Sequence, residues 1–433
     1  MTRSLLHSAA CGGLAALLLL SFPLAAQVPL GFERGRAQNI LDMVSESVEK
    51  NFHDPQLRGL DWKQMTAQAR QEINAAQDVG QMYAAIFALV ERLNDSHTVF
   101  IPPSRAERHL FGFEAKAFGD EIRVSELKKG GRAEAAGLQR GDRILGVNGI
   151  RAERGSIDFV MLYFTVLRPV LFMDVVYARG RETPRTVRIE PEVKKEPLLT
   201  DLNKIENIYQ LIREGQSERE DAETRLYEDG VGYLKLPHFG FSSSALSGIA
   251  KKLAGSRALV IDLRDNPGGY VGSVSDFIGH FEPEPAVIGD FYRRKKAEAW
   301  KIKPRSPLLS MPTFVLVDGA SSSAAELFAY HLQRTGRAVV IGDRTSGRVT
   351  GARTFVNYAG LESRVYFAVQ VAVSRLVFPD GEELEKRGVI PDRTCVPAPD
   401  DLKEKRDPCL DLALSLAREQ LPAQPVPSAT TPR

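Results

Sequence analysis

The stretch TFVLVDGASSSAAEL, residues 313–327, decides the fold of the second half of this chain. Apolar and β-branched residues predict a strand, the small residues from Asp318 predict a tight turn, and the run from Ala324 predicts a helix. Serines at the start of such a helix lie beside unpaired backbone N–H groups and the positive end of the helix dipole. Such a serine either caps the helix or acts as a nucleophile whose oxyanion those amides stabilise.

The sequence around this stretch alternates between predicted strands and helices. Strands are expected at 231–236, 258–263, 313–317 and 338–341, and helices at 271–281 and 324–334. This alternation predicts an α/β core. Gly268 and Gly269 lie between a strand and a helix, where backbone without side chains can approach a substrate closely and present N–H groups.

A different pattern, short strands separated by glycine turns, occupies residues 112–190. Gly137 and Gly141 fit turns that need positive φ, and Asn148-Gly149 is a hairpin signal. This passage resembles a PDZ domain. The resemblance implies that an extended peptide adds a strand to the domain and that its C-terminal carboxylate binds a backbone loop. That loop would be formed by Leu110, Phe111, Gly112 and Phe113.

Composition and the N-terminus indicate an exported globular protein. The 433 residues are 43% hydrophobic and 26% charged, and a net charge of +2 gives no reason to expect nucleic acid or an anionic membrane as partner. Arg3, the apolar residues 12–24 and the pair Ala25-Ala26 predict a cleaved signal peptide; an uncleaved membrane anchor is the alternative. We therefore expect a periplasmic or secreted protein.

Cys395 and Cys409 are the two cysteines that remain after the predicted cleavage. An oxidising compartment favours a disulfide between them, and two buried free thiols is the other interpretation. The pattern alone leaves both open.

Four motifs in order resemble the C-terminal processing (tail-specific) peptidase family, which also contains the tricorn core protease. They are Gly268-Gly269, a Ser-x-Ser-x-x-Glu element at 321–326, a Gly-x-x-Thr-x-Gly element at 342–347 and a Gly-x-x-Pro-Asp element at 388–392. The resemblance implies an α/β fold with a crotonase-like ββα core, an inserted PDZ domain and an N-terminal helical segment.

The predicted organisation runs from one end of the chain to the other. It comprises a signal peptide (1–26), an N-terminal helical segment (27–105), the PDZ domain (106–192), the α/β peptidase core (193–420) and a disordered tail (421–433) rich in Pro, Ala, Ser and Thr.

The resemblance also assigns roles to single residues. Ser323 matches the nucleophile, although its role as a helix cap stays the structural alternative. The amide of Ala324, together with Gly268 or Gly269, matches the oxyanion hole. Glu326 and Thr345 match positions that support the site.

The chain departs from the lysine-type members of the family at Arg348. Many tail-specific peptidases have a lysine there, which serves as general base to the serine. An arginine stays protonated and cannot accept that proton. No lysine lies between Arg334 and Val377 to replace it, so a Ser-Lys dyad is not predicted.

His97 offers another base. The pair Ser96-His97 resembles the serine-histidine pair of tricorn-type members, in which a late glutamate completes a Ser-His-Ser-Glu tetrad; Glu385 lies in the matching region. A histidine accepts protons near neutral pH, and a carboxylate stabilises the charge that develops. Two alternatives remain: His97 only bridges backbone groups, or Glu385 is one surface glutamate beside Glu382 and Glu383.

These features predict an exported serine endopeptidase that cleaves peptides or unfolded proteins, with the PDZ domain binding substrate C-termini. The alternative is a catalytically inactive relative that binds peptides or other ligands. We predict no cofactor and no metal, because the remaining histidines show no metal-ligand spacing. Those histidines of the mature chain are His53, His109, His238, His280 and His331.

Overall fold

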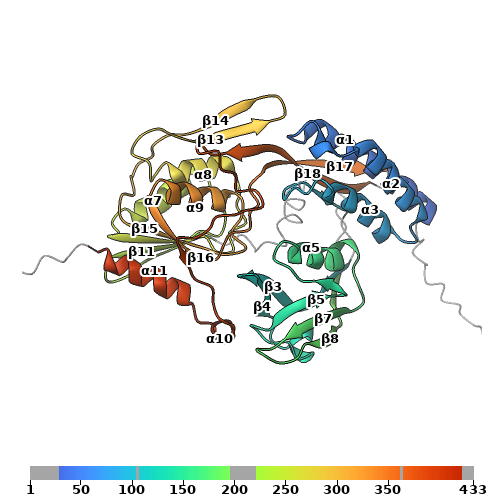
Figure 1. Cartoon of the computed structure of the whole chain (residues 1–433), viewed down its shortest axis with the longest axis horizontal. Helices are drawn as coiled ribbons and strands as arrows, with labels where there is room; N and C mark the ends of the chain where they lie inside the picture. The colour runs from blue at the N-terminus through green and yellow to red at the C-terminus, as the bar shows by residue number, and fades with distance from the viewer. Residues whose placement is uncertain (1–28, 104–106, 196–220, 361–363, 422–433) are drawn as a thin grey trace, which may run out of the picture.

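The computed structural model describes residues 29–103, 107–195, 221–360 and 364–421 (Figure 1). Three helices form the N-terminal segment: α1 (Leu30–Asn51), α2 (Trp62–Ala75) and α3 (Val79–Glu91), with the 3₁₀ turn η1 (Leu57–Gly59) between the first two. Apolar residues recur along α1 at helical spacing, and Ile40, Val44 and Val48 are fully buried. These side chains pack on the strand β18 (Val365–Val377) in one hydrophobic cluster.

The segment predicted to be a PDZ domain forms an antiparallel sheet with the strand order β3-β4-β5-β7-β8, in which β6 also pairs with β5. Asn148 and Gly149 both have positive φ and join β5 to β6 in a two-residue hairpin, as the sequence predicts. The strand β3 lies at one edge of the sheet. The elements are β3 (Phe113–Phe118), β4 (Glu121–Leu127), α4 (Arg132–Ala135), β5 (Arg143–Val147), β6 (Ile150–Arg151), α5 (Ile157–Leu162), the π-helical turn η2 (Tyr163–Leu167), β7 (Met173–Ala178) and β8 (Arg185–Ile189). Beside them, β2 (Glu107–Leu110) pairs with β9 (Glu192–Lys195).

The core contains the predicted α/β sheet, with the order β10-β11-β12-β15-β16-β19. All neighbours are parallel except β10 and β11. Alternate residues of a strand face opposite sides, so Ile261 and Val315 face α7, α8 and α9, whereas Val260 and Phe314 face α11 (Figure 1). The bounds are β10 (Glu223–Leu226), β11 (Val231–Lys235), α7 (Ser243–Leu253), β12 (Ala258–Asp262), α8 (Val271–Ile278), β15 (Thr313–Val317), α9 (Ala324–Arg334), β16 (Ala338–Gly342), β19 (Arg393–Thr394), α10 (Pro399–Glu404) and α11 (Pro408–Glu419).

A second sheet, which the sequence analysis did not anticipate, joins the N-terminal helices to the core. Its strands are β1 (Val99–Ile101), β13 (Ala286–Arg293), β14 (Ala297–Ile302), β17 (Gly351–Ala359) and β18. The strand β1 follows His97 by two residues and pairs with β18 at Val99↔Gln370. The strand β17 begins three residues after Arg348 and also pairs with β18. The segment that follows His97 and the segment that follows Arg348 therefore lie in one sheet, although the predicted PDZ domain separates them in the sequence.

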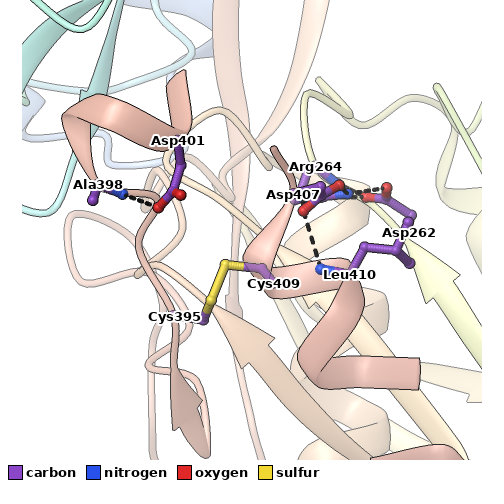
Figure 2. The surroundings of a disulfide bond; sticks show 8 residues. All are labelled: Asp262, Arg264, Cys395, Ala398, Asp401, Asp407, Cys409 and Leu410. Carbon is purple, nitrogen blue, oxygen red and sulfur yellow. Dashed lines mark hydrogen bonds and ion pairs between the residues drawn. A yellow bond between two sulfur atoms is a disulfide. The ribbon is translucent and has the colours of Figure 1, made fainter. Parts of the chain in front are cut away.

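The structure resolves the question of the cysteines, because Cys395 and Cys409 form a disulfide (Figure 2). The bond encloses α10 and the start of α11. Next to it, Arg264 lies 2.7 Å from carboxylate oxygens of both Asp262 and Asp407. Asp407 in turn accepts the backbone N–H of Leu410 and caps α11. The end of β12 is thus tied to the C-terminal helix.

The predicted signal peptide, residues 1–26, and residues 422–433 of the predicted tail lie outside the described residues. The limits predicted for the domains stay predictions. Within the described ranges, no helix is long and apolar enough to cross a membrane.

The disulfide gives a prediction for stability. Cys395 and Cys409 are 14 residues apart in sequence, and a loop of about 15 residues is expected to add about 3 kcal/mol to the free energy of unfolding. Replacing both cysteines by serine should remove this amount in urea unfolding. Dithiothreitol should destabilise the wild-type protein to the same extent and leave the double-serine variant unchanged. An equal effect of the reductant on both proteins would contradict the prediction.

Candidate active site

Ser323 lies at the N-terminus of α9 in a backbone conformation that L-residues rarely adopt, with φ 55° and ψ −118°. Its backbone N–H is held by two acceptors, the Arg348 carbonyl oxygen at 2.8 Å and the Glu326 carboxylate at 3.0 Å. A non-glycine residue with positive φ is strained, and such strain clusters at functional sites. Ser323 is therefore both the residue before the helix and the strained point of the turn.

Gly268 packs directly against this serine. A Cβ placed on Gly268 would lie 2.6 Å from Ser323 Cβ and 2.9 Å from the Ala324 nitrogen, so only glycine fits here. The Gly268 N–H, however, donates to the Asn266 side-chain oxygen at 2.8 Å. Of the amides named as oxyanion-hole candidates, those of Gly269 and Ala324 have no such acceptor among the described residues.

Glu326 holds the loop that follows β16 through hydrogen bonds. Its carboxylate is fully buried and accepts hydrogen bonds from Thr345 Oγ1 at 2.5 Å, Gly347 N at 2.8 Å and Arg348 N at 2.9 Å. Burial raises the pKa of Glu326, and these hydrogen bonds oppose the rise. Thr345 Oγ1 also accepts the backbone N–H of Val389 at 2.6 Å, so three of the four sequence motifs meet at this point.

The turn that carries His97 reaches the same loop through Glu385. Ser96 Oγ lies 3.0 Å from His97 Nδ1 and donates to Glu385 Oε2 at 2.9 Å. The Ser96 backbone N–H donates to Glu385 Oε1 at 3.1 Å, and the Val349 N–H donates to Oε2 at 3.0 Å. The structure therefore brings Ser96, His97 and Glu385 together, although His97 and Glu385 are 288 positions apart in the sequence.

These contacts also determine which ring nitrogen of His97 carries the proton. The Ser96 hydroxyl has one hydrogen, and the Glu385 carboxylate accepts it. The Ser96 oxygen then serves as acceptor toward His97, so Nδ1 carries the ring proton. Nε2 is left with its lone pair, which is the form of histidine that a general base requires.

The electrostatic surroundings keep the His97 ring neutral. Burial and the nearby positive charge of Arg348 lower the pKa of His97 to about 4, while Asp95 opposes the shift. The Arg348 guanidinium is half-exposed and lies 3.5 Å from Asp158, which belongs to α5 of the PDZ domain. Within the described residues, no hydrogen bond joins the His97 ring to Ser323.

The predicted peptide-binding loop lies at the start of the PDZ edge strand. Leu110 ends β2, Phe113 begins β3, and Gly112 between them has φ +79°. Phe111 is buried in the PDZ core. Among the described residues, no strand pairs with the other edge of β3. The loop lies beside this edge, separate from the Ser323 and His97 contacts.

Three residues that the sequence analysis did not select hold the site together. Asn266 fixes Gly268, Asp318 accepts the N–H groups of Asp265, Ala320 and Ser321, and Asp95 accepts the N–H of His97. Each is an Asp or Asn at the end of a strand or within a turn, where such side chains bind nearby backbone. Their place at a strand end or in a turn is the sequence feature that could have identified these three residues. No group of three side chains suited to a metal ion occurs in the described ranges.

Comparison with known proteins is consistent with this architecture. Residues 230–395 match the model of peptidase family S41, and residues 99–162 match the PDZ domain model. The carboxyl-terminal-processing peptidase 1 of Arabidopsis thaliana chloroplasts is 25% identical over 400 residues, covering 86% of this chain and 74% of the relative. The carboxyl-terminal-processing protease of Picosynechococcus is 23% identical and covers 90% of both chains.

Among solved structures, mature CPAF resembles the chain with a TM-score of 0.66 at 16% identity, over 89% of this chain and 97% of that one. The photosystem II D1 C-terminal processing protease gives 0.51 at 20% identity, over 84% and 94%. These likenesses concern the fold. Parts of the chain thus match an S41 peptidase domain and a PDZ domain. The chain is a serine-type peptidase similar to the carboxyl-terminal-processing proteases.

The contact between Gly268 and Ser323 gives a testable prediction. Gly268→Ala should lower the rate of peptide hydrolysis at least about 100-fold, because the new Cβ must displace the serine or the turn. Gly272→Ala in α8 is the matched control: a Cβ there meets nothing within 4 Å, so activity should be unchanged. Activity of Gly268→Ala near the wild-type level would show that the two residues do not need to touch.

Proposed function

We propose that this chain is an exported serine endopeptidase of peptides or unfolded proteins, with Ser323 as nucleophile and His97 as general base. The observation that carries the proposal is the position of the Ser96 hydroxyl, which contacts both His97 Nδ1 and Glu385. This is the arrangement that the resemblance to tricorn-type members implies. A Ser-Lys dyad is not proposed, because position 348 holds an arginine, which cannot accept the serine proton.

In the proposed reaction, Ser323 Oγ attacks the carbonyl carbon of the scissile bond and His97 Nε2 takes the hydroxyl proton. The imidazolium that forms keeps donating its Nδ1–H to Ser96 Oγ. Ser96 Oγ donates in turn to Glu385, so the carboxylate stabilises the positive ring through this hydroxyl. The N–H groups of Gly269 and Ala324 stabilise the oxyanion. His97 then protonates the leaving amine, and water releases the acyl group by the reverse of these steps.

Substrate binding has to complete this site, since the structure holds Ser323 and His97 without a direct hydrogen bond. Such contacts often tighten only in the complex with substrate. The connecting contacts are short: Ser323 N–H to the Arg348 carbonyl, and Val349 N–H to Glu385, which holds Ser96. The loop 345–349 therefore contacts both the nucleophilic serine and the glutamate that holds the histidine turn.

The PDZ domain would bind the C-terminal residues of the substrate. One edge of its strand β3 has no partner strand within the described ranges, and Gly112 with positive φ precedes that strand in the loop expected to bind a carboxylate. The predicted signal peptide supports a periplasmic or secreted location, in which unfolded proteins and peptides are available substrates.

The first test compares the proposed base, His97, with Arg348, which occupies the position of the lysine in lysine-type members. Ser323→Ala and His97→Ala should abolish hydrolysis of an unfolded protein such as casein, because each removes a group that makes or breaks a bond. Arg348→Ala should retain part of the activity, since the side chain does not accept a proton. Undiminished hydrolysis by Ser323→Ala, or a silent His97→Ala together with a faster Arg348→Lys, would overturn the assignment.

The lowered pKa of His97 predicts the pH dependence. A base acts only when neutral, so activity should fall as the pH drops through the pKa of His97, which is about 4. The acid limb of kcat/KM should therefore have its midpoint well below 6.5, the ordinary value for histidine. Arg348→Ala removes a positive charge that lowers this pKa, so the limb should move to higher pH. A midpoint at or above 6.5 in the wild-type enzyme would contradict the prediction.

A further inference from the structure

Asp95 is a buried carboxylate beside the proposed base. Its side chain is fully buried. One oxygen, Oδ1, accepts the backbone N–H of His97 at 3.0 Å, the hydroxyl of Thr98 at 3.0 Å and, at 3.4 Å, the hydroxyl of Thr350. This oxygen therefore holds the His97 turn to the loop that continues from Arg348 toward β17.

The other oxygen, Oδ2, has no hydrogen-bond partner within the described residues. It faces two cationic or titratable groups that come from the segment after α1: Arg58, whose guanidinium lies 3.5 Å away, and His53, whose Nε2 lies 4.0 Å away. The Nε2 of His53 is likewise buried and without a hydrogen-bond partner in the described part of the chain. Buried polar atoms are nearly always paired, so this cluster calls for an explanation.

The hydrogen bonds of Asp95 do not explain why an aspartate occupies this position. An asparagine has the same shape, and its side-chain oxygen could accept from His97, Thr98 and Thr350 just as Oδ1 does. Asparagine would avoid burying a charge, which is unfavourable unless the charge is compensated. What an aspartate adds at this position is a negative charge near the His97 ring.

We propose that Asp95 is a positioning residue for His97: its negative charge, moderated by Arg58, favours the imidazolium that forms when His97 takes the proton of Ser323. The inference rests on the proposed function, because it requires His97 to act as the base. Asp95 acts through His97 and touches no substrate. It complements Ser96, which contacts the ring nitrogen and is itself held by Glu385, by acting from the backbone side of the turn.

The charges that face the two histidines support this role. Asp95 raises the pKa of His97, opposing burial and Arg348. Burial lowers the pKa of His53; Asp95 and Asp54 oppose this, while Arg58 and Arg375 add to it. Arg58 is fixed beside the turn, because its guanidinium also donates to the Asn94 carbonyl oxygen at 2.9 Å. Arg58 therefore weakens the effect of Asp95 without removing it.

Two variants with opposite expected effects test the inference. Asp95→Asn keeps the acceptor oxygen and removes the charge, so kcat on casein should fall about tenfold with KM unchanged. The acid limb of its pH profile should move to lower pH. Arg58→Gln removes the positive charge that faces Asp95, so its acid limb should move to higher pH. Damage to the fold alone would not shift the two limbs in opposite directions.

Asp42→Asn is the matched control, because it removes one negative charge from α1 at an exposed carboxylate that pairs with Arg70. Its kcat and pH profile should equal those of the wild type. Unshifted profiles for both Asp95→Asn and Arg58→Gln, with His97→Ala inactive, would overturn the role of Asp95 and leave the proposed function standing. An active His97→Ala would instead remove the base on which both depend.

Discussion

The site depends on one bridging carboxylate, that of Glu385. It accepts hydrogen bonds from the Ser96 backbone and hydroxyl on one side and from the Val349 backbone on the other. Ser96 precedes the PDZ domain, whereas Val349 belongs to the core loop beside the serine helix. Hydrogen bonds to a charged acceptor are stronger than neutral ones, and removing a buried partner leaves the remaining groups unsatisfied. The histidine and the serine therefore share one set of anchors despite the inserted domain.

Three carboxylates hold the loop 345–350 in succession. Glu326 accepts from Thr345, Gly347 and Arg348, Glu385 accepts from Val349, and Asp95 accepts from Thr350. Glu326 comes from the serine helix, and Asp95 comes from the histidine turn. A displacement of the loop would thus alter the nucleophile and the base together.

The PDZ domain contacts the same region of the core through ion pairs. Arg154 lies 2.8 Å from Asp343, which precedes the loop by two residues, and Lys116 on β3 pairs with Asp265 beside the Gly-Gly turn. Arg348 itself faces Asp158 on α5. The Lys116–Asp265 and Arg348–Asp158 pairs are partly exposed and therefore individually weak, whereas Arg154 and Asp343 are largely buried and form the firmer of these contacts.

Much of the architecture could be predicted from local sequence. The strand, turn and helix at 313–334 follow from residue periodicity, the hairpin at Asn148-Gly149 follows from turn preferences, and motif order indicated the S41 and PDZ combination. The second sheet could not be predicted this way, because its strand β18 pairs with β1, β13 and β17 from distant parts of the chain.

Within the site, too, local sequence predicted some features and not others. The sequence by itself determined that Arg348 cannot be a base and that Ser323 starts a helix. Only the tertiary structure decided that Cys395 pairs with Cys409 and that Ser96 joins His97 to Glu385, because these contacts join residues that are apart in the sequence.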